Sequence, residues 1–407
     1  MFYKKYKEYS VLNTNKIGKK GGGNMPKKIA ILGAGSGGYA MSAELAQLGY
    51  KVNLYEHPNV ANNLKPIIEK GGIDIVVPNL KDKPSEPSVK ENSEFVKITG
   101  KVTSDIKEAV EGVNLIMLVT PAQFRQSFIR LLAPYVEDGQ TIVVWQGYFS
   151  ALQVAGIFKD MGVKKDVTIC ETDSLIYACK KIGSNRVLVK GKKGKVLVAA
   201  FPSNRNENVL RDLKEIFPKC INVKNILETS LNNIGLTLHP ASVLLNMYRV
   251  ERKFYPYFEN TGTLLYSYYD VTPGMAEVME AVDRERIALG KKFDLKISTT
   301  KEALLDYYGA TGKNLYETLL NCNVYQIQIP PTSLQYRYIS EEVPFGFVPI
   351  VFLGDQLGVP VPIIKGMTNI ACAATKIDYW SEGLTMEKLG LSGKTSEEIM
   401  EYANTGK

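Results

Sequence analysis

A glycine-rich turn near the start of the chain lies between an apolar run and a helical pattern. Residues 28–32 are mainly apolar, residues 33–38 read GAGSGG, and residues 37–48 place apolar side chains at helical spacing. A second apolar run covers residues 51–56. A strand, a glycine turn, a helix and a second strand within about 30 residues make a βαβ unit. The sequence therefore predicts that a parallel sheet begins here.

Gly33, Gly35 and Gly38 are in register with the pattern G-x-G-x-x-G. In dinucleotide-binding folds the first glycine permits a tight turn, the second lets a pyrophosphate approach the backbone, and the third lets the helix pack closely on the strand. The N–H groups at the start of the helix, around Ser36, are available to the phosphates. We interpret the motif as the binding site of a dinucleotide cofactor.

Glu56 ends the second strand, near the spacing of about 20 residues expected for the acid that binds the ribose. A carboxylate at this position accepts a hydrogen bond from the 2′-hydroxyl and repels a 2′-phosphate, and the next residue is His57 rather than an arginine. The alternative is a solvated strand end without a ligand. We predict NAD as the cofactor and expect NADP to be disfavoured.

Strand-like and helical patterns alternate as far as about residue 205, and helical patterns dominate afterwards. The later apolar runs cover residues 113–120, 140–145, 166–170, 174–179, 186–190 and 195–200, and the long helical patterns cover residues 226–250, 273–291 and 300–308. This order predicts an α/β protein, with a Rossmann domain over residues 25–205 and an all-α domain over residues 206–407. The crevice between two such domains is the expected site.

The net charge of +8 is concentrated in the first 24 residues, which hold six lysines against one glutamate. The small excess that remains does not predict a face for nucleic acid. Residues 1–24 lack the apolar stretch of a secretory signal and the arginines of a mitochondrial presequence. We interpret them as a disordered basic leader.

The five cysteines form no C-x-x-C pair, which argues against a disulfide framework and a zinc site. No run reaches the roughly 18 apolar residues that a membrane span needs. We therefore expect a cytoplasmic protein without a metal, nucleic-acid or membrane partner. The sequence does not fix the oligomeric state, and a homodimer stays open.

His239 is the second of only two histidines, since His57 lies beside the predicted cofactor site. It precedes Pro240 in an apolar helical stretch, where a proline should end or kink the helix. A lone histidine in an apolar segment is more often a packed core residue than a catalyst, so the pattern alone leaves both interpretations open. Acid–base chemistry by an imidazole, if the chain performs it, falls to His239.

Residues 337–346 (RYISEEVPFG) combine one arginine with two glutamates before an apolar run. The simplest interpretation is a local ion pair between Arg337 and Glu341. In the functional alternative, the guanidinium binds a substrate carboxylate through two hydrogen bonds, and either Glu341 or Glu342 orients His239.

Two other charged segments are interpreted as solvated surface. Residues 191–194 (GKKG) lie between two strand-like runs and are typical of an exposed hairpin turn. Residues 283–286 (DRER) lie in a helical pattern and are interpreted as its solvated face.

Four segments in order resemble the opine dehydrogenases, the family of octopine and nopaline dehydrogenases. They are the glycine turn, residues 171–179 (ETDSLIYAC), residues 238–241 (LHPA) and residues 337–344 (RYISEEVP). The resemblance implies an NADH-dependent enzyme whose small-molecule substrates are an α-keto acid and an amino acid, which it joins reductively through the amino group.

On this resemblance, His239 corresponds to the acid–base catalyst, Arg337 to the arginine that binds the keto-acid carboxylate, and Glu342 to an aspartate that partners the histidine. Glutamate in place of aspartate is a departure, because the extra methylene moves the carboxylate by roughly an ångström and catalytic geometry is sensitive to such shifts. Thr172 and Gln146 fall where the family lines its substrate channel.

Two other functions are compatible with the motifs. One is a two-domain Rossmann dehydrogenase that acts on a hydroxy acid, a sugar phosphate or a preformed imine. The other is an NAD-binding regulator without catalytic activity, which would need the glycine turn and not His239.

Overall fold

The computed structural model describes residues 28–78, 91–252, 271–327, 331 and 333–407. Eight strands form the larger sheet in the order β12-β11-β8-β7-β6-β1-β2-β5. Their bounds are β1 (Lys28–Leu32), β2 (Lys51–Tyr55), β5 (Val102–Thr103), β6 (Leu115–Leu118), β7 (Thr141–Val144), β8 (Thr168–Thr172), β11 (Val196–Phe201) and β12 (Cys220–Asn222). All neighbouring strands are parallel except β8 and β11. The βαβ unit and the parallel sheet predicted from the glycine turn are confirmed.

A smaller sheet of four strands, β4-β3-β10-β9, lies beside the first. It consists of β3 (Gly72–Pro78), β4 (Glu91–Lys97), β9 (Tyr177–Lys181) and β10 (Arg186–Lys192). Helix α2 (Ser36–Gln47) contacts β2 in the large sheet and β3, β9 and β10 in the small one. The helix that follows the glycine turn therefore packs between the two sheets.

Further short helices pack on or beside the strands. These are η1 (Pro58–Leu64), α3 (Lys65–Lys70), α4 (Ile106–Val110), α5 (Ala122–Leu132), η2 (Ala133–Tyr135), α6 (Ser150–Asp160), η3 (Ser203–Arg205) and α7 (Asn206–Lys214). Helices α4, α5 and α6 lie in a different hydrophobic cluster from α2. The central strands β6 and β7 are buried along their whole length, as near-continuous apolar runs in a parallel sheet should be.

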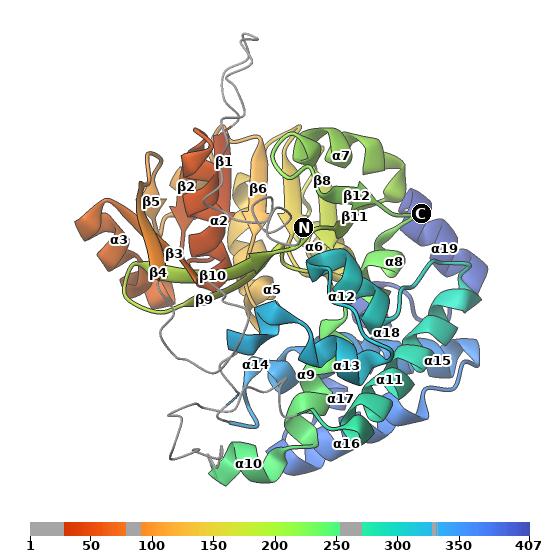
Figure 1. Ribbon diagram of the computed structural model, residues 1–407. Coiled ribbons are helices and arrows are strands. Elements are labelled where there is room, and N and C mark those ends of the chain that lie inside the picture. Colours follow the sequence, from red (N-terminus) through yellow and green to blue (C-terminus); the bar gives the residue numbers. More distant parts are fainter. Residues whose placement is uncertain (1–27, 79–90, 253–270, 328–330, 332) are drawn as a thin grey trace, which may run out of the picture.

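The remainder of the chain is helical, as Figure 1 shows in its green-to-blue half. Its elements are α8 (Ile226–Leu231), α9 (Gly235–Leu244), α10 (Met247–Arg252), α11 (Pro273–Lys292), α12 (Thr300–Tyr308), α13 (Leu315–Leu320), η4 (Asn323–Ile327), α14 (Arg337–Ser340), η5 (Val343–Phe347), α15 (Val348–Leu357), α16 (Pro362–Thr375), α17 (Tyr379–Glu382), α18 (Met386–Leu389) and α19 (Ser396–Thr405). The predicted order of a Rossmann sheet followed by helices is confirmed.

The sheet continues beyond residue 205, because β12 pairs with β11 in parallel register. The division of the chain at residues 205 and 206 stays a proposal, and the pairing of β12 favours a later position for it. The proposed basic leader over residues 1–24 lies outside the described residues. None of the described helices has both the length and the apolar character needed to cross a bilayer.

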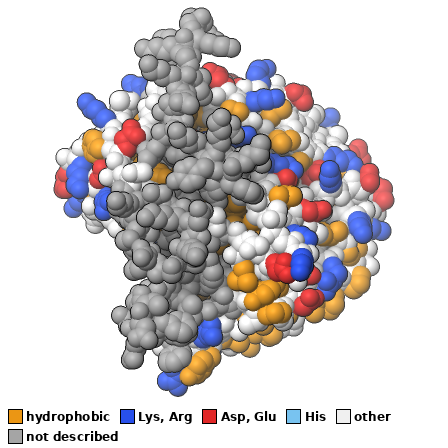
Figure 2. All heavy atoms as spheres, in the orientation of Figure 1, with side chains coloured by type: hydrophobic (Ala, Val, Ile, Leu, Met, Phe, Trp, Pro, Cys, Tyr) orange, Lys and Arg blue, Asp and Glu red, His pale blue; other side chains and the backbone are white. Residues whose placement is uncertain are grey.

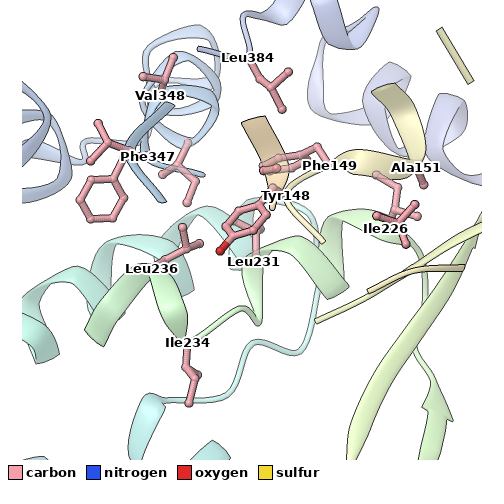
Figure 3. Packing of buried hydrophobic residues seen from close by; sticks show 14 of the residues in the cluster. Tyr148, Phe149, Ala151, Ile226, Leu231, Ile234, Leu236, Phe347, Val348 and Leu384 are labelled. Carbon is pink, nitrogen blue, oxygen red and sulfur yellow. The ribbon is translucent and has the colours of Figure 1, made fainter. Parts of the chain in front are cut away.

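One hydrophobic core joins the sheet to the helical part. Tyr148 and Phe149, which follow β7, pack with Leu231 of α8, Leu236 of α9 and Phe347 of η5, and all five are almost fully buried. Figure 3 shows these side chains from separate elements meeting in one cluster. The two parts of the chain are therefore held against each other by apolar packing.

Residues 283–286 were expected on a solvated face, and this expectation is wrong. Arg286 is fully buried, and its guanidinium donates to Asp283 and to the backbone carbonyls of Leu231 and Ser298. Asp283 also accepts a hydrogen bond of 2.7 Å from the Thr237 hydroxyl in α9. A buried charge is tolerated when it is paired and hydrogen-bonded, and here the pair ties α11 to α9.

Candidate active site

The glycine turn has the geometry that a dinucleotide needs. Gly33 has a φ of +111°, a backbone conformation that residues other than glycine rarely adopt. A Cβ on Gly38 would lie 1.8 Å from the Gly33 carbonyl oxygen, so only glycine allows this contact between helix and strand. A Cβ on Gly35 would meet nothing within 4 Å, which leaves space beside the backbone there. The N-cap of α2 has no side-chain hydrogen bond, so the first N–H groups are available to phosphate oxygens.

Glu56 directly follows β2, and its side chain is hydrogen-bonded to the backbone of the glycine turn. One of its carboxylate oxygens accepts from the Ala34 N–H at 3.1 Å, the other accepts from the His57 N–H at 2.9 Å, and the side chain is buried. An acid at this place suits a ribose 2′-hydroxyl and opposes a 2′-phosphate. Ser36 accepts from the Lys181 N–H at 2.9 Å, which fixes the start of α2 against β9. The residues present fit NAD.

A cavity of about 450 Å³ extends from the glycine turn into the helical part. This volume is in the range typical of small-molecule sites. Its wall includes Gly35 and Ser36 on the cofactor side, and Gln146, His239 and Arg337 among the other predicted residues. The cavity thus brings together residues that are far apart in the sequence, such as Gly35 and Arg337, which are separated by 302 positions.

His239 is paired with Glu342, as expected from the resemblance. The Nδ1 atom of the imidazole forms a short hydrogen bond with a Glu342 carboxylate oxygen, and the glutamate is fully buried. Helix α9 does not end at Pro240 but continues to Leu244, so His239 lies inside a helix. Because Nδ1 is engaged, Nε2 is the nitrogen left for chemistry in the cavity.

Tyr148 is the other partner of the Glu342 carboxylate. Its hydroxyl donates to Glu342 at 2.7 Å and accepts from the Gln146 side-chain amide at 2.7 Å. Burial, and then the neighbouring Glu342, raise the pKa of Tyr148 well above its usual value, so the phenol stays a proton donor. Gln146, Tyr148, Glu342 and His239 therefore form one continuous hydrogen-bond chain.

Tyr338 positions the imidazole ring from its face. The two rings are stacked with centroids 3.8 Å apart and planes 4° from parallel. The guanidinium of Arg337 lies 5.7 Å from the centroid of the same tyrosine. Helix α14 thus places a cation and an aromatic ring next to His239.

Glu341 has a different role from Glu342. It is 3.3 Å from the Arg337 guanidinium and also accepts from the Ala122 N–H at the start of α5 at 2.8 Å. The local ion pair expected from the sequence therefore exists, yet 44% of the Arg337 side chain remains exposed, and Arg337 lines the cavity. The ion pair orients the arginine and leaves room for a substrate carboxylate.

The turn after β7 carries unusual backbone angles. Gln146, Tyr148 and Phe149 have φ values of 69°, 124° and 56°, in a region that non-glycine residues rarely occupy. The buried Arg125 of α5 donates to the carbonyls of residues 145, 146 and 147 and to the Ser150 hydroxyl. Such strain persists where surrounding groups hold it, and it gathers at functional sites.

Thr172 lies behind this turn. Its hydroxyl accepts from the Gln146 N–H at 3.0 Å and donates to the Ser174 carbonyl at 2.9 Å, and the residue is fully buried. Among the described residues that line the cavity, Gln146 is present and Thr172 is not. The structure therefore places Thr172 as a support of Gln146.

Residues 191–194 were expected to form a solvated hairpin, and this expectation is wrong. Lys192 belongs to β10 and forms an ion pair with Glu44 of α2. Lys193 lines the cavity. Sequence reasoning also missed Tyr148, Tyr338 and Arg125. The only signal for Tyr148 and Tyr338 was their position close to Gln146 and Arg337, and Arg125 had none.

Comparison with known proteins gives the family. Residues 222–375 match the family described as "NAD/NADP octopine/nopaline dehydrogenase, alpha-helical domain", and residues 28–148 match the "NAD-dependent glycerol-3-phosphate dehydrogenase N-terminus". An opine dehydrogenase of Arthrobacter sp. (strain 1C) is 32% identical over 375 residues, which is 92% of this chain and 98% of that protein. The chain belongs to the opine dehydrogenase family.

More distant relatives in this family also align with nearly the whole chain. The vitopine synthase of Allorhizobium ampelinum is 22% identical over 93% of this chain and 99% of its own. A solved octopine dehydrogenase with NADH and agmatine is 18% identical, covers 94% of this chain and 98% of its own, and superposes with a TM-score of 0.69. A yersinopine dehydrogenase with bound NADP⁺ is 15% identical, covers 93% of this chain and 98% of its own, and has a TM-score of 0.65. The whole fold is therefore that of the family.

Proposed function

We propose that this member of the family uses NADH to condense an α-keto acid reductively with the amino group of an amino acid. The observation that carries the proposal is that His239, which is paired with the buried Glu342, lines the same cavity as Arg337 and the glycine turn. An acid–base group, a carboxylate binder and a dinucleotide site are the three functions that the reaction requires.

Arg337 binds the carboxylate of the keto acid and presents its carbonyl to the amine. Nε2 of His239 takes the proton released when the neutral amine adds, and returns a proton to the oxygen that leaves as water. Glu342 holds the Nδ1 proton and stabilises the imidazolium that forms between these steps. Bound NADH supplies the hydride that reduces the resulting imine. The arginine and the imidazole are therefore assigned to binding and proton transfer respectively.

Gln146 faces the substrates and keeps Tyr148 oriented, and Thr172 keeps the backbone of Gln146 in place. Glu56 binds the adenosine ribose and favours NAD over NADP. The cytoplasm is the compartment that we propose, because all five cysteines are free and suit a reducing environment. Positive and negative side chains are interspersed over the described part of the face in Figure 2, without a large region of one sign. The partners that we propose are the two small-molecule substrates.

NADH oxidation by the purified protein tests the reaction. We expect NADH to be consumed with pyruvate or 2-oxoglutarate only when an amino acid is also present, and a screen of common amino acids identifies the donor. Equal rates with the keto acid alone would contradict the proposal and favour a hydroxy-acid dehydrogenase. NADH binding without turnover of any pair would favour the regulator.

A further inference from the structure

Three lysines line the cavity in addition to Arg337. Lys180 comes from β9, Lys190 from the end of β10, and Lys193 from the residue that follows β10. Among the described lining residues, Glu341 is the single acid, and it is paired with Arg337. The lysines come from the small sheet, whereas Arg337 comes from the helical part.

Lys193 is held in this wall by its neighbours. Its ammonium lies 4.3 Å from the ring centroid of Tyr307, whose hydroxyl donates to Asp173 at 2.5 Å. Asp173 is buried and also accepts from the Leu197 N–H at 3.0 Å, so its oxygens are already hydrogen-bonded. Asp173 favours the charged form of Lys193 but does not line the cavity, whereas Lys193 does. The Lys193 ammonium is therefore available to a ligand in the cavity.

Lys180, another of the cavity lysines, lies near the segment that carries Arg337. Its ammonium lies 5.9 Å from the ring centroid of Tyr336, the residue that precedes Arg337. The positive groups influence one another. Burial lowers the pKa of Lys193 to about 8, with Asp173 opposing this shift and Arg337 adding to it. Cations gathered in a partly desolvated wall are unfavourable until an anion joins them.

The proposed reaction needs a second anion site. The keto acid carries a carboxylate on the carbon that forms the new C–N bond, the amino acid carries at least one carboxylate of its own, and Arg337 accounts for only the first. We propose that Lys193, assisted by Lys180, binds a carboxylate of the amino acid substrate, opposite the keto-acid carboxylate on Arg337. The inference rests on the proposed function and assigns the two substrates to two walls of the cavity.

The carboxylate that binds the lysines is either the α-carboxylate or a side-chain carboxylate of the amino acid. Three amines distinguish these two cases. L-2-Aminobutyrate carries only an α-carboxylate, 4-aminobutyrate carries only the distal carboxylate, and L-glutamate carries both. With pyruvate as the keto acid, preference for L-2-aminobutyrate over 4-aminobutyrate assigns the α-carboxylate to the lysines. The reverse preference assigns the side-chain carboxylate. L-Glutamate reports whether one substrate uses both groups.

Lys193→Met removes the charge and keeps the length of the side chain. We expect its KM for the preferred amine to rise at least about tenfold, the loss of one charge-assisted hydrogen bond, while the KM values for pyruvate and NADH change less than about threefold. Lys195→Met is the matched control, because Lys195 pairs with Asp306 at the surface two residues away. It should leave all three KM values unchanged.

Three outcomes would overturn the inference. They are unchanged kinetics of Lys193→Met, a rise confined to the KM for NADH, and a rise confined to the KM for pyruvate. If wild type turns over no pair, the proposed function fails by itself. The subsite is then decided by titrating the enzyme–NADH complex with each amine, where equal affinity of wild type and Lys193→Met would overturn it.

Discussion

The Nδ1 atom of His239 is held by Glu342, and Nε2 is the nitrogen left for proton transfer in the cavity. Asparagine at this position would keep a nitrogen near Nδ1 for Glu342 and remove Nε2. We expect His239→Asn to lower kcat by about 10² to 10⁴-fold, the usual contribution of a general acid–base group. Affinity for NADH, followed by its fluorescence, should stay at the wild-type value, because the glycine turn is untouched. Wild-type turnover would contradict the role of His239.

Glu342 occupies a position where the family resemblance leads one to expect aspartate. In this chain its two oxygens reach different partners, His239 and Tyr148. The shorter side chain of Glu342→Asp cannot keep both contacts, so we expect kcat to fall by about 10 to 100-fold, as displacements of about 1 Å do in active sites. Steady-state kinetics measure this loss. A variant faster than wild type would show that the longer acid is not adapted to its surroundings.

At this scale the sequence predicts residue types better than environments. His239, Glu342 and Arg337 could be selected because rare or clustered polar residues stood in segments that resemble a family. Lys193 was misinterpreted because exposure of a lysine in a glycine-flanked turn depends on which helix packs over it. Tyr307 of α12 lies 114 residues beyond Lys193 and 134 residues beyond Asp173.

The turn at residues 146–149 is the element on which the hydrogen-bond chain depends. Arg125 is buried and donates to the backbone carbonyls of residues 145, 146 and 147, so a methionine there would leave these oxygens without their donor. We expect Arg125→Met to lower the free energy of unfolding by about 3 kcal/mol, since unsatisfied buried groups cost about 1–3 kcal/mol each. Urea denaturation measures the loss, and kcat should fall with it because Tyr148 moves.

Arg130→Met is the control for this change. Arg130 lies on the same helix, α5, and is exposed. Surface substitutions usually change stability by less than about 0.5 kcal/mol. If both variants unfolded at the same urea concentration as wild type, Arg125 would not be holding the turn.

Gly235 begins α9 and leaves space for the pair. A Cβ on Gly235 would lie 3.0 Å from the Glu342 carboxylate and 3.3 Å from Nδ1 of His239. We expect Gly235→Ala to lower kcat by at least about tenfold by displacing these groups, with little loss of stability because alanine favours helices. Gly274→Ala at the start of α11 is the matched control, since its Cβ would meet nothing within 4 Å. Equal kcat in the two variants would contradict this reason.

Elements with a strong apolar pattern were predictable and others were not. The bounds of strands β1, β2, β6 and β7 differ from those of the predicted runs by at most two residues, because burial on both faces requires continuous apolar sequence. By contrast, β12 has three residues, and α9 continues through Pro240 because its neighbours stabilise the helix. Tertiary packing decided these cases, and a single sequence does not contain that information.

For the whole molecule, the position of the cofactor side relative to the catalytic side is fixed by shared packing. The core that contains Tyr148 joins the sheet to α8, α9 and η5. Helix α19 returns to β11 and η3, where the Ser203 hydroxyl donates to the side-chain oxygen of Asn404 at 3.0 Å. Figure 1 shows the C-terminus beside β11 and β12. The order of the two parts was predictable from the sequence, and their contact was not.

The charge of the lysine wall makes amino-acid binding depend on pH. Lys193 faces Asp173, Arg337 and Cys179, and burial lowers its pKa to about 8. It is protonated below this pH and loses its charge above it, so affinity for a carboxylate should fall as pH rises through 8. We expect the KM for the amino acid in wild type to increase between pH 7.5 and about 9.5 relative to Lys193→Arg, because arginine stays charged in this range. Comparing the two enzymes at each pH cancels the ionisation of the amine itself, which is the same for both. Parallel KM profiles would show that the charge of Lys193 does not bind the substrate.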